Sequence, residues 1–190
     1  MKVSERNLLS LRLVLGVPVL AGVASGREAA GKLQVATSAL SPPWIFDFKG
    51  MELITASAFR EAILSIVRWA AADGQPCFLA NVDEVTRDEG LIAAAQSNNV
   101  LLFCALDGST ITDVMAIGPL DPKLETTLAL VLQLGEADAK AVSDASGEAT
   151  VTTAWNNRLV ALNRMGLLAE RKVGKTKYYS PVVKGMSYGQ

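Results

Sequence analysis

The chain has 190 residues, half of them apolar, with 18 basic and 19 acidic side chains and a formal net charge of −1. This length accommodates one ordinary domain or two small ones, and the apolar content excludes a disordered chain. Because the chain has no histidine and only two cysteines, histidine-dependent acid–base catalysis, a Ser-His-Asp triad, and histidine-containing or four-thiolate zinc sites are excluded.

The two cysteines, Cys77 and Cys104, both lie in apolar runs of the sequence. We therefore expect buried, reduced thiols, with a reactive nucleophile as the alternative. Reduced thiols fit a cytoplasmic compartment. We predict no cofactor, no metal and no enzymatic activity.

The N-terminal segment imitates a secretory signal, because Lys2 and Arg6 precede an apolar run. Against a signal, Glu5 lies among the basic residues and Arg12 interrupts the apolar run. The uninterrupted apolar stretch, residues 13–24, is shorter than the roughly 20 residues that a membrane span needs. We expect buried β-structure in a soluble cytoplasmic protein, with no membrane association.

The clearest boundary in the sequence is the segment Gly118-Pro119-Leu120-Asp121-Pro122, since proline and glycine interrupt periodic structure. Residues 1–122 hold 9 basic and 13 acidic side chains, net −4, whereas residues 123–190 hold 9 and 6, net +3, which together restore −1. We predict an N-terminal domain over residues 1–118, a linker over 119–122 and a C-terminal domain over 123–190.

The N-terminal part alternates short apolar runs with segments of helical periodicity. Predicted strands are one or two within Leu13–Val23, then Trp44–Phe48, Cys77–Val82, Val100–Leu106 and Val114–Ile117. Predicted helices are Ser25–Leu40, Ser57–Ala72 and Val85–Asn98. This alternation predicts the α/β class, with a mainly parallel or mixed sheet covered by helices.

The C-terminal part has a different pattern, with three helices followed by a hairpin. The predicted helices are one marked by Leu124, Leu128, Val131 and Leu132, a second over Asp138–Ala145, and a third over Thr150–Met165 that stops at Gly166. The runs Leu167–Val173 and Lys177–Val183, joined by Gly174-Lys175-Thr176, predict a β-hairpin. Three helices and a hairpin predict a winged helix-turn-helix.

The third of these helices carries the strongest functional pattern. Its apolar stripe, Val151, Trp155, Leu159 and Leu162, is expected to pack against the other two helices. The polar residues that remain are candidate DNA contacts: Thr152, Thr153, Asn156, Asn157, Arg158 and Arg164. Amide and hydroxyl side chains and arginine can bond base edges and phosphates in the major groove. The alternative is an ordinary solvated helix face.

The hairpin adds a basic run that suits phosphates or the minor groove. Its candidate DNA-binding residues are Arg171, Lys172, Lys175 and Lys177.

The segment from Asn157 to Leu168, followed by Arg171 to Ser180, resembles the recognition helix and wing of bacterial ArsR- and MarR-type regulators. In those regulators a leucine-rich helix ends in Gly-Leu, here Gly166-Leu167, and a basic hairpin closes on Tyr-Tyr-Ser, here Tyr178-Tyr179-Ser180. The resemblance implies double-stranded DNA as the partner. It does not imply metal sensing, because the cysteine and histidine ligands of the metal-sensing members are missing.

In the first part, the segments 25–30 and 45–59 resemble a STAS-like domain, the family of anti-sigma-factor antagonists and their relatives. The resemblance implies that a protein partner recognises the segment that begins the following helix, with Thr55 and Ser57 as candidate partner-binding residues. Ala56 occupies the position of the phosphorylated residue in some members, so no phosphorylation switch is carried over. From the residues alone, Ser57 is expected to cap its helix.

Two weaker patterns have ordinary structural explanations. Ser25-Gly26-Arg27 could bind an anion at a helix start, but we expect this segment only to cap the helix and Arg27 to lie on the surface. The carboxylates between Asp83 and Glu89 are expected to be a solvated helix start and not a metal site.

Together these patterns predict a homodimeric, DNA-binding transcriptional regulator, in which the STAS-like domain mediates dimerisation or senses a partner or effector. The alternative is a partner-switching signalling module that binds proteins through both domains and does not bind nucleic acid.

Overall fold

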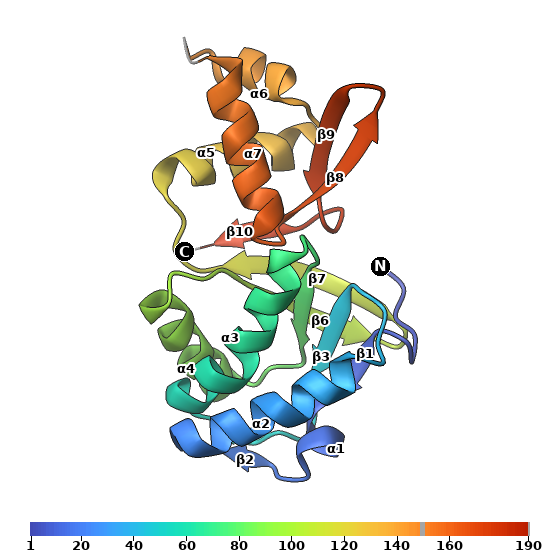
Figure 1. Ribbon diagram of the computed structural model, residues 1–190, viewed down its shortest axis with the longest axis vertical. Coiled ribbons are helices and arrows are strands. Elements are labelled where there is room, and N and C mark those ends of the chain that lie inside the picture. The colour runs from blue at the N-terminus through green and yellow to red at the C-terminus, as the bar shows by residue number, and fades with distance from the viewer. Residues whose placement is uncertain (149–150, 190) are drawn as a thin grey trace.

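The computed structural model of the protein describes residues 1–148 and 151–189. It has a mixed β-sheet with helices against it in the N-terminal part, and a group of helices with a hairpin in the C-terminal part (Figure 1). The predicted α/β class with a mixed sheet is confirmed.

The main sheet has six strands in the order β1-β3-β5-β6-β7-β10. Its strands are β1 (Leu8–Ser10), β3 (Trp44–Asp47), β5 (Cys77–Ala80), β6 (Leu101–Asp107), β7 (Thr110–Ile117) and β10 (Ser187–Gly189). The first four run parallel, β6 and β7 form an antiparallel hairpin, and β10 lies parallel to β7. The central strands are continuous apolar runs because both of their faces are buried.

Two other short strands, β2 (Val19–Leu20) and β4 (Leu53–Ile54), form a separate parallel pair. The N-terminal helices are α1 (Leu11–Leu15), α2 (Gly22–Thr37), α3 (Ala56–Ala72) and α4 (Glu84–Gln96). Helix α3 buries Phe59, Ile63, Ile66, Val67 and Ala70, the face that its sequence periodicity predicts. Over residues 1–148 and 151–189, no helix has the length and apolar character needed to cross a bilayer.

Adjacent residues of the sheet enter two different cores. Phe46, Leu79 and Phe103 pack with the helices of the N-terminal part. Their neighbours Ile45 and Phe78 belong to a second core, which also contains the buried side chains of the C-terminal helices. The C-terminal part is therefore packed on the opposite face of the same sheet.

The prediction of strands over Leu13–Val23 is wrong for most of that segment. Leu11 and Leu15 are both buried on one side of α1, and Gly16, with a φ of 76°, ends that helix in the left-handed conformation. Only Val19–Leu20 is extended. The following helix α2 begins at Gly22 and not at Ser25, so Ser25 lies inside the helix.

The C-terminal part contains α5 (Pro122–Leu134), α6 (Ala139–Ser146) and α7 (Thr152–Arg164), then the hairpin of β8 (Leu168–Val173) and β9 (Thr176–Pro181). Asp121 and Asp138 cap α5 and α6, because their carboxylates accept hydrogen bonds from backbone N–H groups inside those helices. Residue 150, the predicted start of the third helix, lies outside the described residues.

The apolar stripe of α7 is shorter than its pattern predicts. Trp155, Leu159 and Leu162 are fully buried, but Val151 is 72% exposed because it precedes the first turn of the helix. Tyr179 of β9 is also fully buried, and it forms an antiparallel bridge with Ala137 between α5 and α6. The hairpin is thereby fixed to the three helices.

The two parts meet closely at the end of α7 and at the end of β7. Gly166 follows α7 with a φ of 72°, and a Cβ atom there would lie 3.2 Å from the carbonyl oxygen of Gln75. After the hairpin the chain returns to the sheet as β10, and the Tyr188 hydroxyl donates a hydrogen bond of 2.8 Å to the carbonyl of Gly118. This hydrogen bond ties the segment between β7 and α5 to β10.

Candidate nucleic-acid interface

The first two turns of α7 present a group of free hydrogen-bonding side chains. Thr152, Thr153 and Asn157 are exposed, and Asn156 is partly buried. None of the four side chains makes a hydrogen bond within residues 1–148 and 151–189. Figure 1 shows α7 running from the end of the molecule farthest from the main sheet towards the junction, so these turns lie at the far end.

The two arginines of α7 lie apart from this group. The guanidinium of Arg158 lies over the Trp155 ring, 4.3 Å from its centroid, on a flank of the helix. Arg164 lies in the last turn, beside the C-terminal end of α3. The structure therefore brings together four of the six candidate residues on α7 and places Arg164 at the junction.

The β8–β9 hairpin supplies a second group of cations at the same far end (Figure 1). Lys172 lies on β8 and Lys175 in the turn, both exposed, and neither forms an ion pair in the described part of the chain. Arg171, by contrast, donates from Nε to Glu136 Oε1 at 3.0 Å and from Nη2 to Glu136 Oε2 at 2.8 Å. This fork-to-fork geometry lowers the pKa of Glu136 and raises that of Arg171.

The other paired cation is Lys177, whose ammonium lies 2.9 Å from Glu170 Oε2. The hydroxyl of Tyr179 donates to the same oxygen at 3.0 Å. The hydrogen bond from Lys177 is the main reason that the pKa of Glu170 is lowered. Burial, followed by the bond to Glu170, raises the pKa of Tyr179 to about 12.

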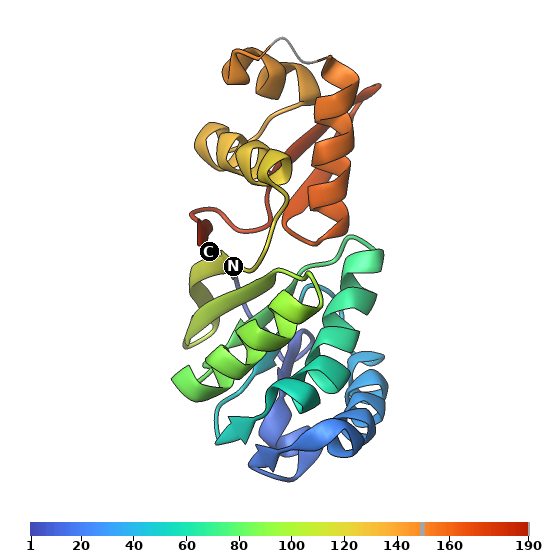
Figure 2. The same ribbon diagram turned by 90° about the vertical axis from the view of Figure 1, so that its left-hand side faces the viewer.

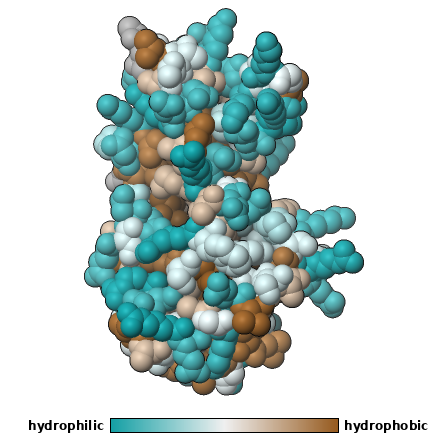
Figure 3. Space-filling view, viewed as in Figure 1, coloured by the Kyte–Doolittle hydropathy of each residue, from teal (hydrophilic) through white to brown (hydrophobic). Residues whose placement is uncertain are grey.

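These contacts divide the four predicted hairpin cations into two classes. Lys172 and Lys175 form no ion pair within the described residues, although the charge of Lys172 helps to lower the pKa of Glu170, whereas Arg171 and Lys177 each have a carboxylate partner. The surface over the hairpin is mostly hydrophilic in Figure 3. The sequence patterns identify neither carboxylate: Glu170 lies within the hairpin, within reach of a local pattern, whereas Glu136 is 35 residues from Arg171.

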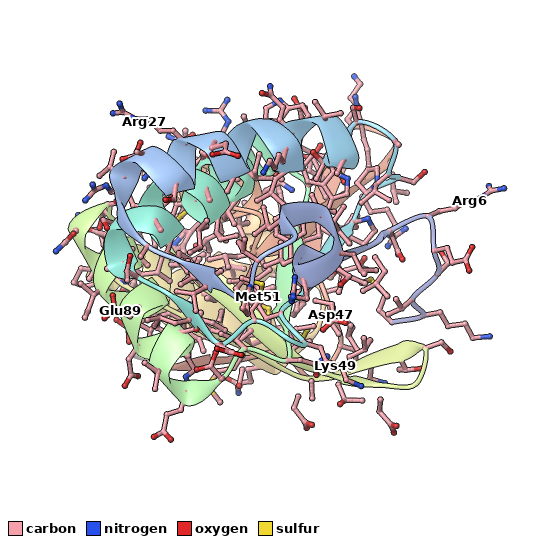
Figure 4. The ribbon with its side chains drawn as sticks, turned by 90° about the horizontal axis from the view of Figure 1, so that it is seen from below. Arg6, Arg27, Asp47, Lys49, Met51 and Glu89 are labelled. Atoms are coloured by element: carbon pink, nitrogen blue, oxygen red, sulfur yellow. The ribbon has the colours of Figure 1, made fainter. Side chains whose placement is uncertain are left out.

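The predicted partner-binding residues lie at the start of α3, and both are partly buried. Thr55 Oγ1 accepts a hydrogen bond from the backbone N–H of Gly22 and lies 3.4 Å from Ser57 Oγ. The expectation that Ser57 caps α3 is wrong, since Thr55 occupies the cap position, Ser57 lies inside the first turn, and the Thr55 side chain makes no capping hydrogen bond within the described chain. Glu89 of α4 accepts the hydrogen bond of the Ala56 N–H. Figure 4 shows Glu89 at this end of the molecule, on the opposite side from Arg6.

The weaker sequence candidates have structural roles. Arg27 lies on the surface, where it binds Glu61 at 3.1 Å (Figure 4). Asp83 caps α4 by accepting from the Thr86 N–H. Burial raises its pKa, but the hydrogen bonds from Thr86, together with those from the backbone of Asp83 and Val85, outweigh burial, and the pKa is lowered. Within the described residues, no cluster of three or more acidic or cysteine side chains could hold a metal.

Both cysteines are free, and burial raises the pKa of each thiol. That of Cys104 reaches about 12, with Asp47 as a second cause. Neither side chain forms a thiolate near neutral pH, as expected for structural cysteines.

The chain matches no family model, no curated protein and no solved structure.

Proposed function

We propose that the protein is a transcriptional regulator that binds double-stranded DNA through residues 123–190, with α5, α6, α7 and the β8–β9 hairpin acting as a winged helix-turn-helix. The observation that supports this proposal is that α7 presents four side chains with no hydrogen bond among the described residues, at the end of the molecule where Lys172 and Lys175 form no ion pair with those residues. A helix of this kind fits the major groove of B-DNA, which is about 12 Å wide.

In this proposal the two groups have different tasks. Thr152, Thr153, Asn156 and Asn157 contact base edges, where amide and hydroxyl groups discriminate between base pairs. Lys172 and Lys175 bind phosphates and supply affinity without sequence preference. Arg171 and Lys177 contribute only to the extent that DNA displaces Glu136 and Glu170 from them.

The N-terminal part, residues 1–118, is proposed to be a STAS-like domain that dimerises the protein or receives a partner signal. One winged helix contacts too few base pairs for high specificity, whereas a symmetric pair contacts two half-sites. Sedimentation equilibrium of the full chain would test the dimer directly.

The decisive experiment is selection of duplexes from a random pool by the purified protein at matched salt. The proposal expects an enriched palindromic motif. An unchanged pool, with no retained duplex even at low salt, would contradict it.

Two substitutions separate base contacts from phosphate contacts. We expect Asn157→Ala to relax base preference at one position, with discrimination reduced by about 1–3 kcal/mol. Lys175→Ala should weaken binding to all duplexes similarly and reduce the slope of log K against log salt by about 1. Filter binding of specific and random duplexes over a salt series measures both. Lys49→Ala, an exposed lysine at the opposite end of the molecule (Figure 4), is the matched control and should change neither.

A second candidate function is a signalling module that binds a protein partner. The two ion pairs favour it, because Glu136 and Glu170 already neutralise half of the hairpin cations. Replacing Arg171, Lys172, Lys175 and Lys177 together by alanine distinguishes the two functions. Loss of partner binding, with no measurable affinity for DNA in the parent protein, would favour the signalling module.

A further inference from the structure

A hollow of about 260 Å³ lies at the junction of the two parts, where the C-terminal ends of α3 and α7 meet. Both ribbon views show the lower end of α7 directly above α3 (Figures 1 and 2). Arg68 of α3 and Arg164 of α7 both line this hollow, together with the successive residues Asn98 and Asn99 that follow α4. Its walls thus come from both halves of the chain.

The two arginines are exposed and have no partner. Neither forms an ion pair or a hydrogen bond within the described ranges, and no aspartate or glutamate is among the residues that line the hollow. Three other arginines, Arg27, Arg60 and Arg171, each lie within 3.4 Å of a carboxylate oxygen. Two more, Arg87 and Arg158, lie over aromatic rings. The junction therefore concentrates positive charge that the protein itself does not neutralise.

The two asparagines at this place differ in their hydrogen bonds. The Asn99 amide donates to the carbonyl of Ser97 at 2.6 Å, but the Asn98 side chain is unpaired among the described residues. The end of the α7 dipole accounts for a cation at Arg164 alone. Arg68 precedes the last turn of α3, where the dipole of that helix has little effect, so its guanidinium adds a second positive charge to the hollow that no carboxylate among the lining residues offsets.

We propose that this hollow binds a phosphate group, with Arg68 and Arg164 as fork-shaped donors and the Asn98 amide as a third. Guanidinium groups bind phosphate oxygens in pairs and remain charged at all physiological pH values. Because one arginine belongs to each part of the chain, the bound phosphate holds α3 and α7 together. The phosphate comes either from a small free anion or from a duplex that passes along α7.

The first test is calorimetric titration of the full chain with inorganic pyrophosphate at low salt and without DNA. The parent protein is expected to bind, and Arg68→Gln or Arg164→Gln should each weaken binding about tenfold or more. Arg6→Gln is the matched control, since Arg6 is an exposed arginine that points outward from the side of the molecule (Figure 4) and does not line the hollow. Lys175→Ala should also leave pyrophosphate binding unchanged, which separates this site from the proposed DNA interface.

A second variant tests the charge argument in the opposite direction. Ala71 also lines the hollow and is partly buried, so Ala71→Glu places a carboxylate beside both arginines. This variant should lose pyrophosphate binding. In the parent protein, pyrophosphate should raise Tm because it binds the folded state; in Arg68→Gln and Arg164→Gln that rise should disappear.

Measuring duplex binding by the same variants distinguishes the two sources of the phosphate. If pyrophosphate does not bind, but Arg68→Gln reduces duplex affinity and the salt slope while Arg6→Gln does not, the phosphate belongs to DNA. If neither pyrophosphate binding nor duplex binding depends on Arg68 and Arg164, the proposal is overturned.

Discussion

The protonation state of Tyr179 affects the stability of the hairpin, because the ring of Tyr179 is fully buried and its hydroxyl donates a hydrogen bond to Glu170. Its pKa is raised from 10.0 to about 12 in the folded protein. The folded state therefore holds the proton more tightly than the unfolded chain. Its contribution to stability is complete below about pH 10 and is lost as the pH rises towards 12.

Tyr179→Phe removes this contribution. We expect the parent protein to be more stable than the variant by about 1–2 kcal/mol near neutral pH, with the difference decreasing above about pH 10. Urea unfolding from about pH 8 to about pH 11 measures it. Tyr178→Phe is the control, because the Tyr178 hydroxyl has no hydrogen bond in the described part of the chain. A difference between parent and Tyr179→Phe that stays constant over this range would show that the hydroxyl does not titrate as inferred.

At the scale of elements, the crossing of α2 and α3 depends on one glycine. A Cβ atom on Gly26 would lie 2.8 Å from the carbonyl oxygen of Ala58 and 2.9 Å from Glu61 Cβ, closer than real Cβ atoms approach. Gly31 lies five residues further along the same helix, where a Cβ atom would meet nothing within 4 Å. The two positions therefore form a matched pair.

We expect Gly31→Ala to stabilise the protein by about 0.5–1 kcal/mol, because alanine restricts the unfolded chain and favours the helix. Gly26→Ala should destabilise it by about 1–3 kcal/mol, because the two helices must separate. Urea unfolding midpoints measure both changes. Equal effects of the two substitutions would mean that α2 and α3 are not in contact at Gly26.

The sequence predicts best those elements whose secondary structure follows from the pattern of their own side chains. The buried run from Cys77 to Ala80 and the periodic face of α3 need no information from elsewhere in the chain. The run after Leu13 is apolar without a clear period, and its helix depends on burial of Leu11 and Leu15. Strand β10 has no strand-like pattern, and only its pairing with Met115–Ile117 makes it extended.

In the candidate interface too, features set by local sequence are predicted and features set by tertiary contacts are not. The polar side of α7 and the basic run of the hairpin are local in sequence, so the pattern identified them. The ion pair between Arg171 and Glu136 and the position of Arg164 beside Arg68 depend on tertiary contacts that local patterns do not contain.

At the scale of the whole molecule, the two parts share one core and one sheet. Phe78 and Leu102 of the sheet belong to the same buried cluster as Leu128 and Trp155 of the C-terminal helices. We therefore expect a single unfolding transition, with far-UV circular dichroism and tryptophan fluorescence giving the same urea midpoint. Two separated transitions in the parent protein would contradict a shared core.

Truncation after Met186 removes β10 and should lower this midpoint, because the pairing with β7 and the Tyr188–Gly118 hydrogen bond are both lost. Tyr188→Phe, which removes only the hydrogen bond, should have a smaller effect. If the truncated chain were as stable as the parent, the contacts of β10 with β7 and Gly118 would not stabilise the protein.

The position of β10 also affects how the protein is made. Tyr188 and Gly118, which bond at the end of β7, are 70 residues apart in sequence. At a synthesis rate of roughly 5–20 residues per second, the edge of β7 stays unpaired for on the order of 4–14 s before the ribosome has synthesised β10. During that interval the nascent chain carries an uncovered strand edge, of the kind that pairs with other chains. A polypeptide released by a stop codon that lies after β7 and before β10 would keep that edge, so we expect such products to aggregate.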